Sequence, residues 1–374
     1  MSSNEFDGRE FQAPMLVSPL IDELNPLIDS VSQRLGRKLQ IMEVCGGHTH
    51  AIFQNGLEQL ISSNLEFVHG PGCPVCVLPT EAIDNATLIA ETSNTILVTF
   101  GDVLRVPGKK GDLQKVKALG ADIRVVYSPM DVLSIADAHR DKSVVFFAIG
   151  FDTTMPSIAL TIQAAKKRAL TNLSFLCYHI RLIPTLQTLL ERDNVVIDGF
   201  IGPGHVSIVI GSSAYQPIAK AFKKPFVISG FEPVDILHAL LKLIRQIDTS
   251  RCEVENAYAR VVSPEGNDIA QAAIHDVFVN SDYSWQGLGS VPNSVTSLTQ
   301  EYAMLDASGR YAVSNRCAPS QSSYCEQVLT GQLKPTQCPK FNRECTPDTP
   351  LNALMVSSEG ACAAYYTYKV RVHA

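Results

Sequence analysis

Short apolar runs alternate with helical patterns along much of the chain, and this alternation constrains the fold more than any other feature. Eight runs are candidate strands: 39–44, 65–69, 96–100, 123–127, 144–149, 173–178, 195–201 and 225–229. Helical patterns lie between them, for example over 80–92 and 184–191. Because a parallel connection needs a crossover about as long as a helix, this order indicates parallel sheets. The sequence therefore predicts an α/β protein.

The length of the chain implies several domains. It has 374 residues, of which 45% are hydrophobic and 18% charged, values typical of a folded multidomain protein. A first helix is expected to begin at Asn25-Pro26 and to end at Gly36. We expect two similar parallel-sheet α/β domains facing a central cleft, followed by a smaller domain in the tail rich in proline and cysteine. The expected bounds are 1–36 for the N-terminal helical segment, 37–122 and 123–236 for the α/β domains, and 237–374 for the last domain.

A faint internal similarity links two of the predicted strands. The segment 65–73 reads Leu-Glu-Phe-Val-His-Gly-Pro-Gly-Cys, and 198–205 reads Asp-Gly-Phe-Ile-Gly-Pro-Gly-His. One interpretation is the same strand-to-turn transition in two similar halves. The other is that Gly-Pro-Gly makes a tight turn twice. The sequence alone leaves both open.

Charge and hydropathy exclude several classes of partner. The net charge of −6, with no long basic run, argues against nucleic acid. No apolar stretch reaches the roughly 18 residues that a membrane helix needs, and the first ten residues lack the apolar core of a secretory signal. We therefore expect a cytoplasmic protein. In that reducing compartment, thiols serve metals or redox chemistry more often than structural disulfides.

Ten cysteines fall into a front group and a back group. In the front group, Cys45 begins the motif Cys-Gly-Gly-His-Thr-His, and a thiolate beside the imidazoles of His48 and His50 suits iron. The alternative is a glycine turn with a buried structural cysteine. Cys73 and Cys76 form a C-x-x-C pair, which favours redox chemistry, although half of a zinc site has the same spacing.

The back group supplies four thiols from the tail, namely Cys325, Cys338, Cys345 and Cys362. Four thiolates are what a [4Fe–4S] cluster requires, whereas structural zinc sites use closely paired cysteines. Unrelated thiols or disulfides are the alternative. Cys317 lies near the first of the four and makes the choice of that ligand ambiguous. Cys177, inside a predicted strand, and Cys252, in a polar context, suggest no chemistry.

Polar residues follow several of the predicted strands. Cys45, Cys73, Asp102, Asp152 and His205 each come after an apolar run. Ligands of parallel sheets bind outside the carboxyl ends of the strands, so two facing sheets would gather these residues in one cleft. Taken singly, either aspartate is better explained as a satisfied turn residue, and only the clustering favours a functional role.

Together, in this order, the motifs resemble the HypD family of hydrogenase maturation factors. The matching segments are 45–50, 70–76, 100–108, 150–154, 202–207 and 357–366, and they span nearly the whole chain. Two positions depart from the family pattern. Asp152 replaces the usual glutamate, which puts a specific role for that carboxylate in doubt, and Gln286 replaces the usual arginine, which we expect to change only a surface contact.

The resemblance implies two α/β domains and a [4Fe–4S] domain. It also implies assembly of the Fe(CN)2CO group of [NiFe] hydrogenases in complex with the chaperone HypC, with cyanide delivered by HypE, which works with HypF. On this basis Cys45 helps to hold the iron, Cys73 and Cys76 are the redox pair, and the four late cysteines bind the cluster. The candidate catalytic residues are Cys45, His48, Cys73, Cys76, Asp102, Asp152, His205 and Glu359.

Two function classes use the same cysteines. The leading hypothesis is a metallocofactor assembly scaffold with redox activity rather than a conventional turnover enzyme. The alternative is an iron–sulfur thiol–disulfide oxidoreductase that acts on a partner protein. Such a reductase does not need the Cys45 motif, so that motif favours the scaffold. A zinc-stabilised binding module is a third, weaker interpretation.

Overall fold

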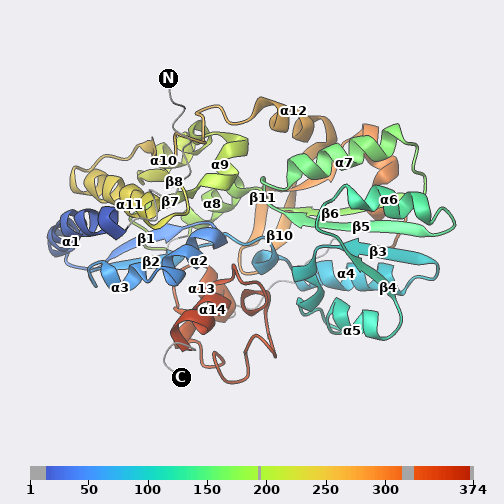
Figure 1. Ribbon diagram of the computed structural model, residues 1–374, viewed down its shortest axis with the longest axis horizontal. Helices are drawn as coiled ribbons and strands as arrows, with labels where there is room; N and C mark the ends of the chain where they lie inside the picture. Colours follow the sequence, from blue (N-terminus) through green and yellow to red (C-terminus); the bar gives the residue numbers. More distant parts are fainter. Residues whose placement is uncertain (1–13, 193–194, 314–323, 371–374) are drawn as a thin grey trace.

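The computed structural model describes residues 14–192, 195–313 and 324–370, and its strands and helices alternate as predicted (Figure 1). Its strands form two parallel sheets and one antiparallel hairpin. The prediction of an α/β protein with parallel sheets is confirmed. Within the described ranges, no helix combines the length and the apolar character needed to cross a bilayer.

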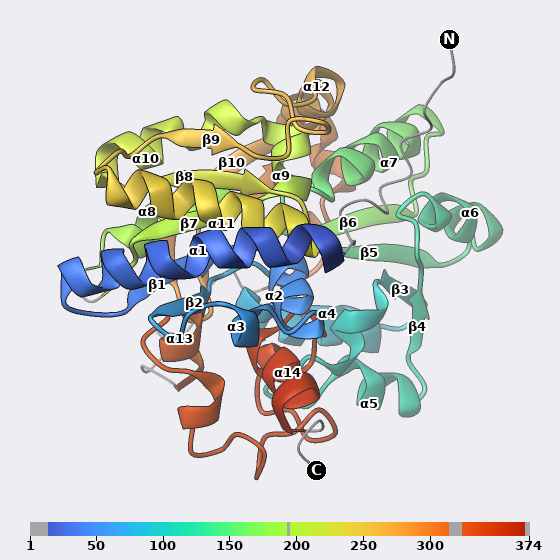
Figure 2. The ribbon, with the colours of Figure 1, turned by 60° about the vertical axis from the view of Figure 1, so that its left-hand side comes forward.

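The first sheet has five parallel strands in the order β2-β1-β7-β8-β9. Their bounds are β1 Leu39–Glu43, β2 Leu65–His69, β7 Gly199–Pro203, β8 Phe226–Ser229 and β9 Val254–Asn256. Two helices, α1 (Pro14–Leu35) and α11 (Pro233–Asp248), lie side by side along this sheet (Figure 2). Helices α2 (Gly46–Gln54), α3 (Leu57–Leu60), α8 (Leu182–Leu190), α9 (Gly204–Ile210) and α10 (Gln216–Phe222) connect or cover its strands.

The second sheet has four parallel strands in the order β4-β3-β5-β6. Their bounds are β3 Thr95–Thr99, β4 Asp122–Val125, β5 Ser143–Gly150 and β6 Leu173–His179. Its helices are α4 (Thr80–Glu91), α5 (Leu113–Ala118), α6 (Asp131–Ala138) and α7 (Met155–Lys167). β3, β5 and β6 are buried on both faces, which is why their sequences are almost continuously apolar, whereas the edge strand β4 is only partly buried.

The two sheets do not follow the expected division into 37–122 and 123–236. β1 and β2 belong to the first sheet, the next four strands form the second, and β7 returns to pair with β1. Pairing joins strands that are neighbours in space, and the apolar pattern of a strand does not identify its neighbour. The two Gly-Pro-Gly turns therefore follow strands on either side of β1 in one sheet, and they do not belong to two separate sheets.

The expected last domain, 237–374, is also divided by the structure. α11 and β9 belong to the first sheet, and α12 (Asp268–Val277) packs on α7. The hairpin of β10 (Phe278–Trp285) and β11 (Gly289–Leu298) joins the open edge of β6, where Arg181 N–H donates to the Ser294 carbonyl at 2.8 Å. The tail, with α13 (Tyr324–Leu329) and α14 (Ala361–Tyr365), lies beneath α2 and β2 (Figure 2).

The first helix is longer than expected. Among the described residues it begins at Pro14, so Asn25-Pro26 lies inside it, and it ends before Gly36, which has a φ of +67°. A proline inside a helix removes one backbone hydrogen bond. Leu24, Ile28 and Val31 are fully buried in the core shared with α11, and this packing offsets the loss.

A buried histidine at the end of β6 makes stability dependent on pH. His179 is fully buried against the ring of Phe278, and burial lowers its pKa from 6.5 to about 3. Between pH 3 and pH 6.5, His179 is protonated in the unfolded chain but neutral in the folded chain. The free energy of unfolding therefore falls as the pH falls from 6.5 towards 3. We expect His179 to cost about 1.4 kcal/mol of unfolding free energy per pH unit in this window.

Urea unfolding at pH 7.5 and 5.5 measures this cost. The wild-type midpoint should drop more than that of His179→Leu, whereas alanine in place of the exposed His275 should leave the drop unchanged. An equal drop in wild type and His179→Leu would remove this residue as the cause.

Candidate functional site

The Cys45 turn lies at the carboxyl end of β1 and begins α2. The Cys45 carbonyl accepts hydrogen bonds from the amides of His48 (2.9 Å) and Thr49 (3.2 Å). Two glycines let other segments approach this turn, since a Cβ on Gly72 would overlap the Cys45 backbone and a Cβ on Gly46 would overlap Glu359. The backbone of the Cys45 turn is therefore packed against the turn after β2 and against the tail, and Cys45 itself stays partly exposed.

Adding one methyl group at Gly72 should disrupt this turn. The clash in Gly72→Ala is with backbone atoms, which cannot rotate away, so we expect a loss of about 1–3 kcal/mol in unfolding free energy. Thermal unfolding of the purified variant measures it. Gly309→Ala is the matched control, because nothing lies within 4 Å of its added Cβ. Equal stability of the two variants would contradict the packing described here.

Burial is the main influence on the Cys45 thiol. It raises the pKa to about 12, assisted by the negative charges of Glu43 and Glu359 and opposed by the amides of Gly47 and His48. The thiol is thus protonated near neutral pH. A cation that binds here must displace that proton, and the surrounding negative charge favours such a cation.

Two imidazoles stack on one phenyl ring beside this turn. His48 is fully buried, and its ring centroid lies 4.6 Å from that of Phe231. The exposed His205, in the first turn of α9, lies 4.0 Å from the same ring. His48 Nε2 is 2.9 Å from the Gly230 carbonyl oxygen. Burial lowers the pKa of both histidines, so both imidazoles are neutral at neutral pH.

The second imidazole of the motif has a different place. The ring of His50 meets Tyr368 edge-on, with centroids 5.5 Å apart and the phenol oxygen 3.3 Å from Nδ1. This contact joins α2 to the tail. The sequence suggested a thiol with two imidazoles, but His50 contacts the tail whereas His48 stacks on Phe231.

Glu359 connects residues from both sheets. Burial raises its pKa, and so do the negative charges of Asp102 and Glu43, which therefore lie near it. Asp102 is exposed on the turn Gly101–Arg105 after β3, whereas Glu43 ends β1. The tail contacts the turns after β1 and β3, since Glu359 borders Gly46 and Arg105 donates to the Val356 carbonyl at 3.0 Å.

Asp152 has a structural place in this arrangement. Its side chain is buried, and its carboxylate accepts hydrogen bonds from Arg181 Nε at 2.5 Å and from the Leu182 amide at 3.0 Å. The same Arg181 donates to Asn280 on β10 at 2.9 Å. Asp152 therefore ties β5 and β6 to the hairpin, and the shorter side chain is sufficient for this ion pair.

The C-x-x-C pair is buried next to the tail. Cys73 is 4% exposed and Cys76 is 1% exposed, and their free thiols contact each other. Burial, then Cys73 and Cys362, raises the pKa of Cys76 well above its ordinary value. Cys76 Sγ also lies 3.8 Å from the Ala353 carbonyl oxygen. The pair is thus placed between the Cys45 turn and Cys362.

The four late cysteines line one cavity of about 640 Å³, together with Val328, Phe341 and Leu354. Cys362, at the start of α14, is buried, and burial raises its pKa, with a smaller contribution from the other three cysteines. No three potential ligands among the described residues stand close enough for a single metal ion. Four thiols spread around a mostly apolar cavity are the donor set of a [4Fe–4S] cluster, so these residues fit that group.

Gln286 lies at this cavity, not on an outer surface. Gln286 lines the cavity together with the four cysteines, and its backbone N–H donates to the Val77 carbonyl at 2.9 Å. The expectation of a mere surface contact is therefore wrong. Glutamine in place of the family's usual arginine therefore changes the polar lining of the cavity near the four thiols.

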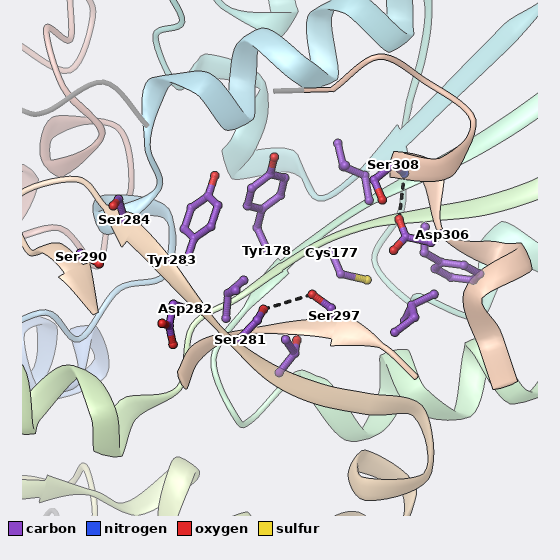
Figure 3. A pocket seen from close by; sticks show the side chains of 15 residues that line it. Cys177, Tyr178, Ser281, Asp282, Tyr283, Ser284, Ser290, Ser297, Asp306 and Ser308 are labelled. Carbon is purple, nitrogen blue, oxygen red and sulfur yellow. Dashed lines mark hydrogen bonds between the residues drawn. The ribbon is translucent and has the colours of Figure 1, made fainter. Parts of the chain in front are cut away.

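The remaining cysteines stand apart from these sites. Cys177 lines a separate polar cavity of about 260 Å³ between β6 and the hairpin, near Asp306 (Figure 3). Burial raises its pKa far above the ordinary value, so its thiol is unreactive. Cys252 contacts the Lys223 carbonyl, and Cys317 lies outside the described residues.

Three residues of the site escaped the sequence interpretation. Phe231 was indistinguishable from a core aromatic residue. Glu43 and His69 end the apolar runs of β1 and β2, and both are buried. A buried carboxylate needs a partner, so a charged residue at the end of an apolar strand was the available signal.

Comparison with known proteins identifies the family. The profile of the HypD family, described as "Hydrogenase formation hypA family", matches residues 20–369. The hydrogenase maturation factor HypD of Escherichia coli is 51% identical over 366 residues, covering 96% of this chain and 97% of that protein. The HypD of Rhodobacter capsulatus is 46% identical over 365 residues, covering 96% and 97%. The chain therefore belongs to the HypD family and has a role in hydrogenase maturation.

Proposed function

We propose that this protein is the scaffold on which the Fe(CN)2CO group of a [NiFe] hydrogenase is assembled, with the iron as cargo at Cys45. The observation that carries the proposal is the continuous sequence of contacts from the Cys45 turn to the cavity of the four cysteines. Glu359 borders Gly46, and the Gly46 amide donates to the Gly72 carbonyl, next to Cys73. Cys76 Sγ lies 3.8 Å from the carbonyl of Ala353, whose neighbour Leu354 lines the cavity with Cys362. These contacts support a cation site, a dithiol and a cluster site that work together.

Each group has a distinct part in the proposed assembly. Cys45 supplies a thiolate to the iron after losing its proton, and the neutral His48 and His205 border the same turn. The cavity of the four late cysteines would hold a [4Fe–4S] cluster, which supplies electrons when bound. Cys73 and Cys76 would exchange electrons with it, and their packing in one buried cluster with Cys362 supports this role.

The family name implies that other maturation proteins interact with this chain. We propose that a HypC-type chaperone shares the iron through a second thiolate and that HypE, working with HypF, delivers cyanide. The partly exposed Cys45 and the exposed His205 leave one side of the site open to such a partner.

A reductase that acts on a partner protein requires an exposed thiol that can contact the partner's disulfide. Cys73 and Cys76 are 4% and 1% exposed, which favours internal electron exchange over attack on another protein. The zinc alternative favours closely paired cysteines, and no two of Cys325, Cys338, Cys345 and Cys362 are closely paired in the sequence.

Infrared spectroscopy of the anaerobically purified complex with its HypC-type chaperone tests the proposal. Cyanide and carbonyl stretches are expected, in proportion to iron bound beyond the cluster. A complex that is fully loaded with iron in cells and yet lacks both stretches would contradict the scaffold proposal. Reduction of a partner's disulfide by the wild-type protein, with no such bands, would support the reductase instead.

A further inference from the structure

We propose that Glu43 and His69 form a positioning dyad that holds the Cys45 turn and the C-x-x-C turn in a fixed relation. This inference rests on the proposed function, since it names the residues that preorganise the same site. The two are direct partners in the parallel register of β1 and β2. Each is the last residue of its strand, just before a cysteine turn.

Glu43 accepts hydrogen bonds from three directions. The Cys45 amide donates to Oε2 at 3.0 Å, and the Thr49 hydroxyl donates to Oε1. His69 Nδ1 lies 2.7 Å from the same Oε1. The side chain is 1% exposed. Three hydrogen-bonding groups thus converge on one buried carboxyl group, so Glu43 fixes both ends of the turn from Cys45 to Thr49.

His69 anchors the other side of the dyad. A carboxylate partner at Nδ1 places the proton of the ring on that atom, and Nε2 has no hydrogen-bond partner among the described residues. The ring is 6% exposed and packs at 5.2 Å from Phe53 on α2 and edge-on at 5.7 Å from Tyr365 on α14. His69 is therefore packed between α2, which follows Cys45, and α14, which carries Cys362.

The backbone completes the link between the two turns. The Gly70 amide donates to the Glu43 carbonyl at 2.9 Å, and the Gly46 amide donates to the Gly72 carbonyl at 3.2 Å. A change in the dyad therefore moves both cysteine turns together. In metal sites, partners of this kind orient the ligand without touching the metal, and their loss reduces metal affinity roughly 10–100-fold.

Two substitutions at His69 separate hydrogen bonding from packing. His69→Asn retains a donor near the position of Nδ1 but removes the ring, whereas His69→Phe retains a ring but removes the donor. We expect His69→Phe to lose about tenfold or more in iron capture at Cys45, as does Glu43→Gln. His69→Asn should stay within about threefold of wild type, since its charge-assisted hydrogen bond is kept.

A second readout does not depend on iron. The Cys73–Cys76 disulfide is equilibrated with glutathione, two molecules of which reduce it to the dithiol and leave as one oxidised glutathione, and the products are counted by thiol alkylation. We expect the equilibrium constant to shift about fivefold in His69→Phe and Glu43→Gln but not in His69→Asn. A structural role for the ring alone would move His69→Asn instead.

The outcomes divide cleanly. Wild-type behaviour of His69→Phe, or equal losses in both His69 variants that circular dichroism shows to be folded, would overturn the dyad. If the glutathione equilibrium shifts as expected but the wild-type complex shows no cyanide or carbonyl stretches, the dyad stands and the scaffold proposal fails. If the stretches are present and neither readout changes, the scaffold stands and the dyad fails.

Discussion

Replacing Cys45 by alanine is expected to abolish iron capture and hydrogenase maturation while the fold persists. The thiol is the one soft ligand in the turn before α2, and Glu43 and Glu359 surround it with negative charge. Loss of a direct ligand should exceed the 10–100-fold cost of losing an outer partner, so we expect at least about a 100-fold fall in bound iron.

Iron quantification and infrared spectroscopy on the chaperone complex measure this loss. Cys177→Ala is the matched control, because that thiol is also enclosed but lines the separate cavity beside the hairpin (Figure 3). Its iron content and its infrared bands should equal those of wild type. Full bands in Cys45→Ala would show that the iron is held elsewhere.

Replacing Cys362 by alanine is expected to have the second large effect, loss of the [4Fe–4S] cluster. Cys362 is the most buried of the four thiols lining the cavity, at 8% exposed, and the one that interacts with Cys76. Removing it leaves three thiols and breaks the contact between the cavity and the C-x-x-C pair. Maturation should fall to background with it.

Visible absorption with iron and sulfide analysis of anaerobic protein measures the cluster directly. The brown absorption of a [4Fe–4S] cluster should disappear in Cys362→Ala, and Cys252→Ala should retain it, since Cys252 lies far along the chain near Lys223. Iron and sulfide at wild-type levels in Cys362→Ala would show that the cavity is not the cluster site.

The sequence predicted the strands well where burial is complete on both faces. β2 lies at 65–69 as predicted, and β5 differs from its predicted bounds by one residue at each end. The hairpin was missed because β10 alternates serine and asparagine with aromatic residues and is only partly buried. β9 was missed because it has three residues and no apolar run. Strand order could not be predicted, because pairing depends on contacts between distant segments.

The candidate site was predicted residue by residue but not as a geometry. Motifs identify side chains such as Cys45 and Glu359, and the structure brings these two together around Gly46. The roles of Asp152 and His50 could not be read in advance, because each depends on a partner from another segment: Arg181 in one case, Tyr368 in the other. A motif states which group is present, and only the fold states what it contacts.

The interleaving of the two sheets has a consequence for synthesis on the ribosome. β1 and Cys45 emerge early, but β7 and β9 complete their sheet only after residue 256 has been made. Glu359 and Cys362 are made later still. Glu359 packs against the Cys45 turn, and Cys362 packs in one cluster with the C-x-x-C pair. A nascent chain therefore presents the Cys45 thiol without its enclosing partners. On the proposed function, the complete surroundings of the iron would form only after residue 362 has been made.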